Sequence, residues 1–199
     1  VLVFSAFVAV LDVIENFMKL IHNKDPTSMV YGYDQYQTTW EFGKDYYKLD
    51  GSTPGSVRYD MIQNFNKEKN TRLRCFLISA KAGGQGINLI GANRCVLIDT
   101  SWNPASDQQN IFRIFRLGQQ KPCYIYRLVA LGTMEEKIYS RSVTKQAMSG
   151  RVVDRQTIDR HYRGGELSDL YQFTEYSYSQ RETPIMPHDN VLKYLLKNY

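Results

Sequence analysis

The sequence predicts an α/β fold in which a mostly parallel sheet is flanked by helices and followed by a C-terminal helical extension. Two observations support this fold class. Short apolar runs, rich in β-branched and aromatic residues, alternate with segments whose apolar residues recur every three or four positions. In addition, 199 residues of which 43% are hydrophobic are enough for one well-packed core. Successive strand–helix–strand units with right-handed crossovers then give a parallel sheet.

Five strands are expected, at residues 1–4, 46–49, 75–79, 95–99 and 123–130. The helical periods between them cover residues 10–21, 57–65 and 107–119. Residues 22–44 have no sustained period and are interpreted as an insertion. We therefore expect a main domain at 1–148 that contains this insertion, and a helical extension at 149–199. Within the extension, residues 171–187 look like an extended tail before a last short helix at 190–197.

The second half of the chain carries most of the positive charge. The net charge is +5, and between Arg113 and Arg163 eleven basic residues stand against four acidic ones. Lys137, Arg141 and Lys145 follow one another at four-residue steps, which predicts a basic stripe on a helix. Such an excess suits a polyanion, either nucleic acid or a nucleotide phosphate, although a solvated face without a partner has the same pattern.

Two classes of site are not expected. The apolar opening VLVFSAFVAVL is 11 residues long, whereas a membrane-spanning helix needs about 20, so no membrane partner is predicted. The three cysteines lie 20 and 28 residues apart, which is typical of neither a metal site nor a disulfide framework. We expect no metal site and a reducing compartment; the cysteines are Cys75, Cys95 and Cys123.

The segment DQQNIFRIFRLGQ, residues 107–119, is the strongest candidate for chemistry. If it is helical, Gln109, Arg113 and Arg116 share one face. The opposite, apolar face would pack on the sheet and contains Ile111, Ile114 and Phe115. Two guanidinium groups held side by side suit a phosphate whose charge grows during transfer, where one arginine is worth roughly 10³ to 10⁵ in rate. The alternative is two arginines on a solvated helix face.

A glycine-rich turn follows the third strand directly. In SAKAGGQGINL, residues 79–89, Gly83, Gly84 and Gly86 would leave backbone amides free to approach phosphate oxygens at the carboxyl end of a strand. The same glycines also suit a purely structural turn. The phosphate loop G-x-x-x-x-G-K-[ST] does not occur in the sequence.

Two further loops place a polar or aromatic side chain at a strand end. In LDGSTPGSVR, residues 49–58, Ser52 or Thr53 would cap the helix that Pro54 opens. Arg58, one turn later, is placed for a nucleic-acid phosphate. Trp102 stands in the loop after the fourth strand, where it would either pack in the core or contact a base or sugar.

Taken in order, these blocks resemble the second RecA-like lobe of superfamily 2 helicase-type translocases of the SWI/SNF chromatin-remodelling kind. The blocks are VLVFS, LDGST, SAKAGGQGINL, DTSWNPASDQQNIFRIFRLGQ and YRLVALGTMEEKIYSR, and they cover residues 1–141. The continuation from KQAMSGRVV to RETPIMP, residues 145–187, looks most like the ATRX branch. Neighbouring recombination-type and androgen-receptor-interacting branches share much of it.

This resemblance implies a RecA-like lobe and assigns roles to single residues. Arg113 and Arg116 would be the catalytic groups at the ATP phosphates, and the cofactor edge would be completed by Gln109, Gly83, Gly84 and Gly86. A second set would face DNA: Ser52, Thr53, Arg58, Ser79, Lys81 and Trp102. The chain departs from the family pattern at four positions, with Ala80 for a common Thr, Ala6 for Gln, Gln85 for Leu and Phe115 for His.

The implied function is the second ATPase lobe of a nuclear, ATP-dependent DNA translocase that acts on double-stranded DNA and chromatin, with histones or histone chaperones as further partners. ATP and Mg²⁺ would be held mainly by an N-terminal ATPase lobe, because this chain has neither a phosphate-loop lysine nor the acidic pair that holds the metal. We therefore expect the chain to be part of a longer protein and to be inactive alone. The alternative is a nucleic-acid-binding or protein-docking module without a catalytic share, with residues 113–163 as its surface.

Overall fold

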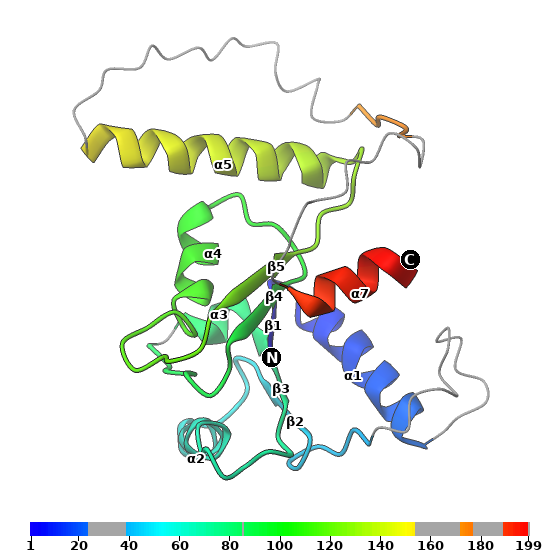
Figure 1. Cartoon of the computed structure of the whole chain (residues 1–199), viewed down its shortest axis with the longest axis vertical. Helices are drawn as coiled ribbons and strands as arrows, with labels where there is room; N and C mark the ends of the chain where they lie inside the picture. The colour runs from blue at the N-terminus through cyan, green and yellow to red at the C-terminus, as the bar shows by residue number, and fades with distance from the viewer. Residues whose placement is uncertain (24–38, 85, 154–171, 177–188, 199) are drawn as a thin grey trace.

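Five parallel strands form the sheet at the centre of the molecule (Figure 1). The computed structural model describes residues 1–23, 39–84, 86–153, 172–176 and 189–198. The strands are β1 (Leu2–Ser5), β2 (Tyr46–Leu49), β3 (Cys75–Ser79), β4 (Arg94–Leu97) and β5 (Tyr124–Arg127), in the spatial order β2-β3-β1-β4-β5. Every neighbouring pair is parallel. All five strands predicted from the sequence are therefore confirmed.

Helices cover both faces of this sheet. Helix α1 (Val8–Asn23) connects β1 to β2, and α2 (Gly55–Phe65), α3 (Ala80–Gly83) and α4 (Pro104–Ile111) follow β2, β3 and β4. The chain runs from β1 to one edge of the sheet and then back across it. Right-handed crossovers therefore place α1 on one face and the other three helices on the opposite face, as Figure 1 shows. The predicted α/β class is confirmed.

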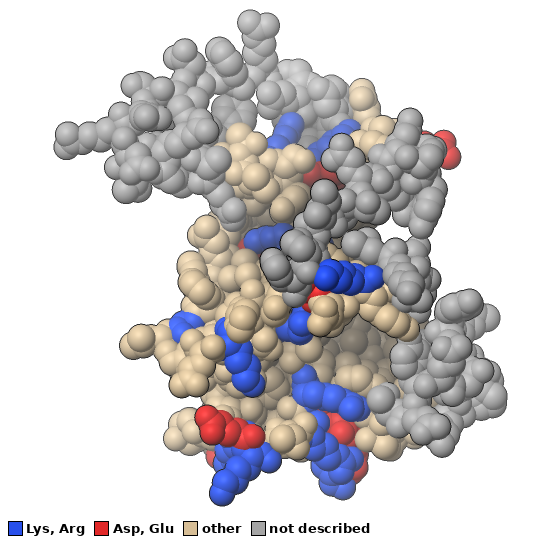
Figure 2. All heavy atoms as spheres, viewed as in Figure 1, with Lys and Arg blue, Asp and Glu red and all other residues tan. Residues whose placement is uncertain are grey.

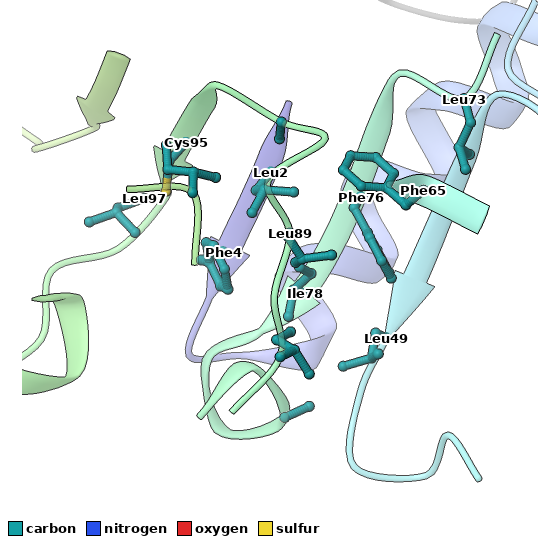
Figure 3. Packing of buried hydrophobic residues seen from close by; sticks show 14 residues of the cluster. Leu2, Phe4, Leu49, Phe65, Leu73, Phe76, Ile78, Leu89, Cys95 and Leu97 are labelled. Atoms are coloured by element: carbon teal, nitrogen blue, oxygen red, sulfur yellow. The ribbon is translucent and has the colours of Figure 1, made fainter. Parts of the chain in front are cut away.

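The larger of two apolar clusters lies between the sheet and helices α2 to α4. Alternate residues of a strand point to opposite faces, so β1 contributes Leu2 and Phe4 to this cluster, and β3 contributes Phe76 and Ile78. Figure 3 shows these side chains beside those of Leu49, Phe65, Leu73, Leu89, Cys95 and Leu97. Complete burial of one large apolar side chain is worth about 1.5 to 3 kcal/mol, so this cluster is the main source of the stability of the sheet.

The smaller cluster lies under α1 and consists of Leu11, Tyr46, Cys75 and Leu77. Tyr46 is fully buried, and its hydroxyl donates to Glu15 Oε1 at 3.0 Å. Burial and this carboxylate raise the pKa of Tyr46 well above its usual value. The phenol thus remains neutral and fixes α1 to the edge strand β2.

The predicted insertion at 22–44 is described only at its ends, because residues 24–38 lie outside the described residues. Trp40 packs against the smaller cluster, and its amide donates to His22 Nδ1 at 3.3 Å. The Arg74 guanidinium lies 4.3 Å from the centre of the Trp40 ring. The last part of the insertion is therefore attached to the core.

Helix α5 (Met134–Val153) follows β5 and leads from the main domain into the predicted C-terminal extension. It runs without a break through residue 148, where the sequence suggested a domain boundary, so that division stays a prediction. Lys137 and Arg141 lie on α5 as predicted, and Lys137 Nζ donates to the carbonyl of Gln172 at 2.6 Å. The side chain of Lys145 lies outside the described residues, as do residues 154–171 and 177–188, which include most of the predicted tail.

Asp189 fastens the end of the chain to the sheet. Its buried carboxylate accepts from Arg94 Nη1 at 3.1 Å, from the Tyr126 hydroxyl at 2.6 Å and from the Val191 amide at 3.1 Å. Helix α7 (Asn190–Asn198) follows it directly and confirms the short helix predicted at 190–197. Because β4 and β5 supply partners of Asp189, the start of α7 is held next to these two strands.

The described residues contain neither a membrane-spanning helix nor a cluster of metal ligands. No helix among them is long and apolar enough to cross a membrane, and they contain no group of three or more His, Cys, Asp or Glu that could hold a metal ion. The three cysteines are free thiols. Burial raises the pKa of Cys75 to about 11 and that of Cys95 to about 12, so these two thiols are unreactive at neutral pH.

Candidate functional site

Four loops meet at the edge where the parallel strands end. They follow β2, β3, β1 and β4, in that spatial order, and we call residues 50–53, 79–81, 5–7 and 99–102 the carboxyl edge. In open parallel sheets this is the side where ligands bind. The strand order thus aligns candidate residues that lie almost 100 positions apart in the sequence.

A cleft of about 370 Å³ opens at the carboxyl edge. Its lining comes from the ends of β1, β3 and β4 and from helix α4, and includes Ala6, Lys81, Gly84, Asp99, Asp107 and Gln109. Three of the predicted site residues, Lys81, Gly84 and Gln109, therefore share one cleft.

Asp99 holds the loop after β1 against β4. Its Oδ2 accepts from Ser5 Oγ at 2.5 Å, and both carboxylate oxygens lie 3.0 Å from the Ala6 amide. Ser5 Oγ also accepts from the Phe7 amide at 3.1 Å. This pair was not predicted from the sequence, although Ser5 and Asp99 each follow directly after a run of four apolar residues, which is a usable signal.

Asp107 and Arg127 form a second largely buried contact, at the wall of the cleft. Asp107 lies on α4, and its Oδ2 accepts from Arg127 Nη1 at the end of β5. Burial raises the pKa of the Asp107 carboxyl, and the nearby Arg127 opposes this shift only in part. The position of α4 relative to the edge strand β5 depends on this pair.

Helix α4 is shorter than the sequence predicted. The predicted helix over 107–119 ends at Ile111, and the turns after it mix four-residue bonds with three-residue ones, such as Arg113 N to the Asn110 carbonyl at 3.2 Å. The prediction that Gln109, Arg113 and Arg116 share one helical face is therefore wrong. Phe115, expected on the apolar face, is 64% exposed, whereas Ile114 is fully buried as expected.

The two arginines of this segment have different surroundings. Arg113 is 8% exposed, and its guanidinium donates to the carbonyls of Gly84 at 3.2 Å and Ile87 at 3.4 Å. Burial, and then repulsion by Arg116, lowers the pKa of Arg113. Arg116 is exposed, and no hydrogen bond or ion pair joins its guanidinium to another residue in the described ranges. A phosphate role for either arginine stays a prediction, and Arg116 is the one available to a ligand in this conformation.

The glycine-rich turn does not present free amides at two of its three glycines. The amide of Gly84 donates to the Ala80 carbonyl at 3.2 Å, and that of Gly86 to the Gly84 carbonyl at 3.1 Å. The prediction that backbone amides are free to approach phosphate oxygens is therefore wrong for these two glycines. Gly83 is required by packing, because a Cβ atom there would lie 2.8 Å from the Phe4 ring. Gly86 has φ +63°, which favours glycine.

The turn before α2 also differs from the prediction. The N-cap residue of α2 is Pro54, and no side chain caps the helix. Ser52 Oγ instead donates to Asp50 Oδ1 at 2.6 Å, and Thr53 Oγ1 accepts from the Asp50 amide at 3.2 Å. The capping prediction is wrong because both hydroxyls bond to Asp50, the residue directly after β2. Ser52 is exposed at the carboxyl edge.

The remaining candidates for DNA contact differ in how far their side chains are exposed to solvent. Trp102 is 50% exposed, so the interpretation as a core residue is wrong. Lys81 is exposed, and Arg58 is half-buried on α2. Ser79 is buried, and its Oγ accepts from the Ala82 amide at 3.3 Å, which caps α3. DNA contacts by all four stay predictions, and Ser79 already has a partner within the fold.

Positive charge is spread over the face shown in Figure 2. Lys and Arg side chains lie at several separate places, with Asp and Glu beside them towards the lower end. The charge on this face therefore does not single out one binding surface, and the arrangement of particular residues carries more information.

The parallel sheet between two helical layers matches the C-terminal RecA-like lobe of a helicase. Residues 1–118 match the family described as "Helicase conserved C-terminal domain". The chain belongs to this family. The resemblance found in the sequence is thereby confirmed.

Proteins named ATRX are among the relatives to which the chain is similar. It is 47% identical to the Transcriptional regulator ATRX homolog of Drosophila melanogaster, over 100% of the chain and 15% of that protein. It is 45% identical to Transcriptional regulator ATRX of Homo sapiens, over 99% of the chain and 8% of that protein. The C-terminal part of the Fun30 ATPase domain, a crystal structure, has a TM-score of 0.54 and 34% identity, covering 70% of this chain and 38% of that one. The chain thus spans about a seventh or less of the length of these curated relatives.

Proposed function

We propose that the chain is the second ATPase lobe of an ATP-dependent DNA translocase that acts on double-stranded DNA in nuclear chromatin. In this proposal the carboxyl edge holds the DNA backbone, and Arg116 acts on the phosphates of ATP bound mainly by a preceding ATPase lobe. DNA binding would be largely independent of sequence, because it uses backbone phosphates. Histones or histone chaperones would be further partners, as the relatives' name, transcriptional regulator, makes reasonable.

The alignment of exposed side chains along the carboxyl edge is the observation that carries this proposal. Ser52 follows β2, Lys81 follows β3 and Trp102 follows β4, so three separate loops offer a hydroxyl, an ammonium group and an indole along one side of the sheet. Hydroxyl and ammonium groups are common donors to DNA phosphates, and an aromatic ring can rest on a sugar or base.

The candidate nucleotide-binding residues suit a phosphate better than a metal. Arg116 offers an exposed forked donor, which is the geometry that phosphate oxygens accept in pairs. The described residues contain no cluster of acidic groups that could hold Mg²⁺. Arg116 and Gln109 would therefore approach the nucleotide while a preceding lobe held the metal. ATP hydrolysis would supply the free energy for each step along DNA.

The alternative is a binding module without a catalytic share, and Arg116 separates the two. In a full-length protein that carries both lobes, Arg116→Ala should lower ATP turnover by about 10³ or more and leave nucleotide affinity within about tenfold. Lys121→Ala, which removes an exposed charge before β5, is the matched control. Unchanged turnover in Arg116→Ala would favour the binding module. The 199-residue chain alone should hydrolyse no ATP above background.

Trp102 tests the DNA half of the proposal. In the full-length protein, Trp102→Ala should keep most of the ATPase rate, while translocation per ATP falls, because one aromatic contact is worth about 1 to 3 kcal/mol. Phe17→Ala removes a half-exposed ring from α1 and serves as the control. Parallel loss of melting temperature and of both activities would contradict a coupling role for the indole.

A further inference from the structure

Glu135, in the first turn of α5, contacts the loop that carries Trp102. Its Oε1 accepts from the Thr100 amide at 3.3 Å, and its Oε2 accepts from the Ala130 amide at 2.9 Å. Thr100 and Glu135 lie 35 positions apart in the sequence. One half-buried carboxylate therefore joins the loop after β4 to the segment between β5 and α5.

The start of α5 is itself held in place, as a group that positions another must be. Thr133 Oγ1 accepts from the Glu135 amide at 3.1 Å. Glu136 Oε2 accepts from the Gly132 amide at 2.8 Å, and the Gly132 carbonyl accepts from the Thr174 amide at 2.9 Å. Carboxylates in the first turn also suit the partial positive charge at the N-terminus of a helix. The Glu135 carboxylate thus extends from a well-bonded turn.

The loop from Asp99 to Asn103 is held at both ends and exposed in its middle. Asp99 is bonded to the loop after β1, and Asn103 Oδ1 caps α4. Between them Trp102 is 50% exposed. Thr100 Oγ1 is buried without a partner among the described residues, so this hydroxyl does not hold the loop. The bond from the Thr100 amide to Glu135 is therefore what ties this part of the loop to α5.

We infer that Glu135 is a positioning residue, which holds the loop 100–103 against α5 and so sets the direction in which Trp102 meets DNA. The inference rests on the DNA contact proposed for Trp102. A carboxylate that accepts from two backbone amides at once fixes its distance to both, and its removal leaves both amides without their acceptor. Since α5 leads into the C-terminal extension, Glu135 also connects that extension to the carboxyl edge.

Hydrogen exchange resolved at single amides tests the contact without DNA or ATP. In Glu135→Ala the Thr100 amide should exchange about tenfold faster, because its acceptor is gone. Glu136→Ala is the matched control. It removes a carboxylate from the same helical turn, together with its bond to the Gly132 amide, but leaves the contact with Thr100. Exchange of the Thr100 amide in this control should stay within about twofold of the wild type.

Glu135→Gln provides a second variant of nearly the same size. Its side chain has one acceptor oxygen for two backbone amides, so the Thr100 and Ala130 amides cannot both be bonded to it. The summed exchange of these two amides should lie between the values for the wild type and Glu135→Ala. If Glu135→Ala does not fold, this variant decides the question.

Translocation shows whether the contact acts through Trp102. In the full-length protein with both lobes, Glu135→Ala should lower translocation per ATP by about threefold or more, part of the effect expected from loss of the indole. The double variant Glu135→Ala, Trp102→Ala should be no worse than Trp102→Ala alone, because the carboxylate has nothing left to position. Glu136→Ala should translocate as the wild type.

Three results would overturn the inference. The first is wild-type exchange of the Thr100 amide in Glu135→Ala, or equal acceleration in Glu136→Ala, which would indicate fraying of α5. The second is wild-type translocation per ATP in Glu135→Ala when Trp102→Ala is impaired. The third is a double variant whose loss is the sum of the two single losses. Wild-type translocation in Trp102→Ala would instead overturn the proposed DNA contact, and exchange at Thr100 would still show whether Glu135 holds the loop.

Discussion

The two edges of the sheet each contain a buried aspartate paired with an arginine, but the two carboxyl groups behave differently. Asp45 precedes the edge strand β2 and pairs with Arg72, while Asp107 on α4 pairs with Arg127 at the other edge strand, β5. The pKa of Asp45 is lowered to about 2, chiefly by its hydrogen bonds from Arg72. The pKa of Asp107 is raised, chiefly by burial.

The number of donors explains this difference. The Asp45 carboxylate accepts from Arg72 Nε at 3.0 Å and Nη2 at 3.1 Å, from the Glu41 amide at 2.8 Å and from Thr39 Oγ1 at 3.2 Å. Asp107 depends mainly on Arg127. A buried carboxylate is stabilised when several donors replace its lost water, and one charged partner is not enough. Asp107, whose pKa burial raises, is thus the one of these two carboxyl groups that lines the candidate cleft.

The largest expected effect is at the β2 edge. Asp45→Ala leaves the Glu41 amide and the Arg72 guanidinium without their acceptor, so the free energy of unfolding should fall by about 2 to 4 kcal/mol. Urea denaturation measures the change. Asp60→Ala, at an exposed position on α2, should stay within about 0.5 kcal/mol of the wild type. A similarly small effect for Asp45→Ala would remove the contrast between the edges.

A smaller effect is expected when the pair at the β5 edge is replaced. The double variant Asp107→Asn, Arg127→Met removes both charges together, and the burial cost disappears with them. Its free energy of unfolding should lie within about 1 kcal/mol of the wild-type value. Asp107→Asn alone leaves Arg127 without its partner and should cost more than the double variant. A double variant as unstable as Asp45→Ala would show that the two pairs are equivalent.

The pH dependence of stability should have opposite signs at the two edges. Asp45 has a folded pKa below its ordinary value of 3.8, so its contribution is present above about pH 4 and is lost as the pH falls towards 2. The stability difference between the wild type and Asp45→Asn should therefore shrink on acidification. Asp107 has a raised folded pKa, so its ionised form opposes folding, and acidification should stabilise the wild type relative to Asp107→Asn. Urea midpoints at pH 7, 5 and 3 measure both stability differences. The same dependence on pH for Asp45→Asn and Asp107→Asn would contradict the contrast between the two edges.

The smallest expected effect is local opening at the two thiols. The Cys75 amide donates to the Asp45 carbonyl at 3.3 Å, whereas Cys95 on β4 lies towards the β5 edge. Asp45→Asn should weaken the β2 side by about 1 kcal/mol and raise the alkylation rate of Cys75 about fivefold, with Cys95 unchanged. Mass spectrometry of the labelled peptides separates the two sites. Equal acceleration at both cysteines would indicate global unfolding.

The strands were predictable because their signal is local. A strand buried on both faces needs a continuous apolar run, and CFLIS at β3 is buried at all five positions. The end of α4 was not predictable in the same way. The apolar period continues through Ile114, but Arg113 turns inward to carbonyls 26 and 29 residues earlier in the chain, and no pattern within 107–119 contains that information.

The sequence by itself determined the α/β class, the places of the five strands and the family, because these follow from short-range patterns and from ordered motifs. It also pointed to Arg116, Lys81 and Trp102 as candidates. Only the tertiary structure decided that Trp102 is exposed, that the amides of Gly84 and Gly86 are already bonded, and that Arg113 is buried while Arg116 is not. Burial and hydrogen-bond partners depend on which strand ends lie side by side, and strand order is a long-range property.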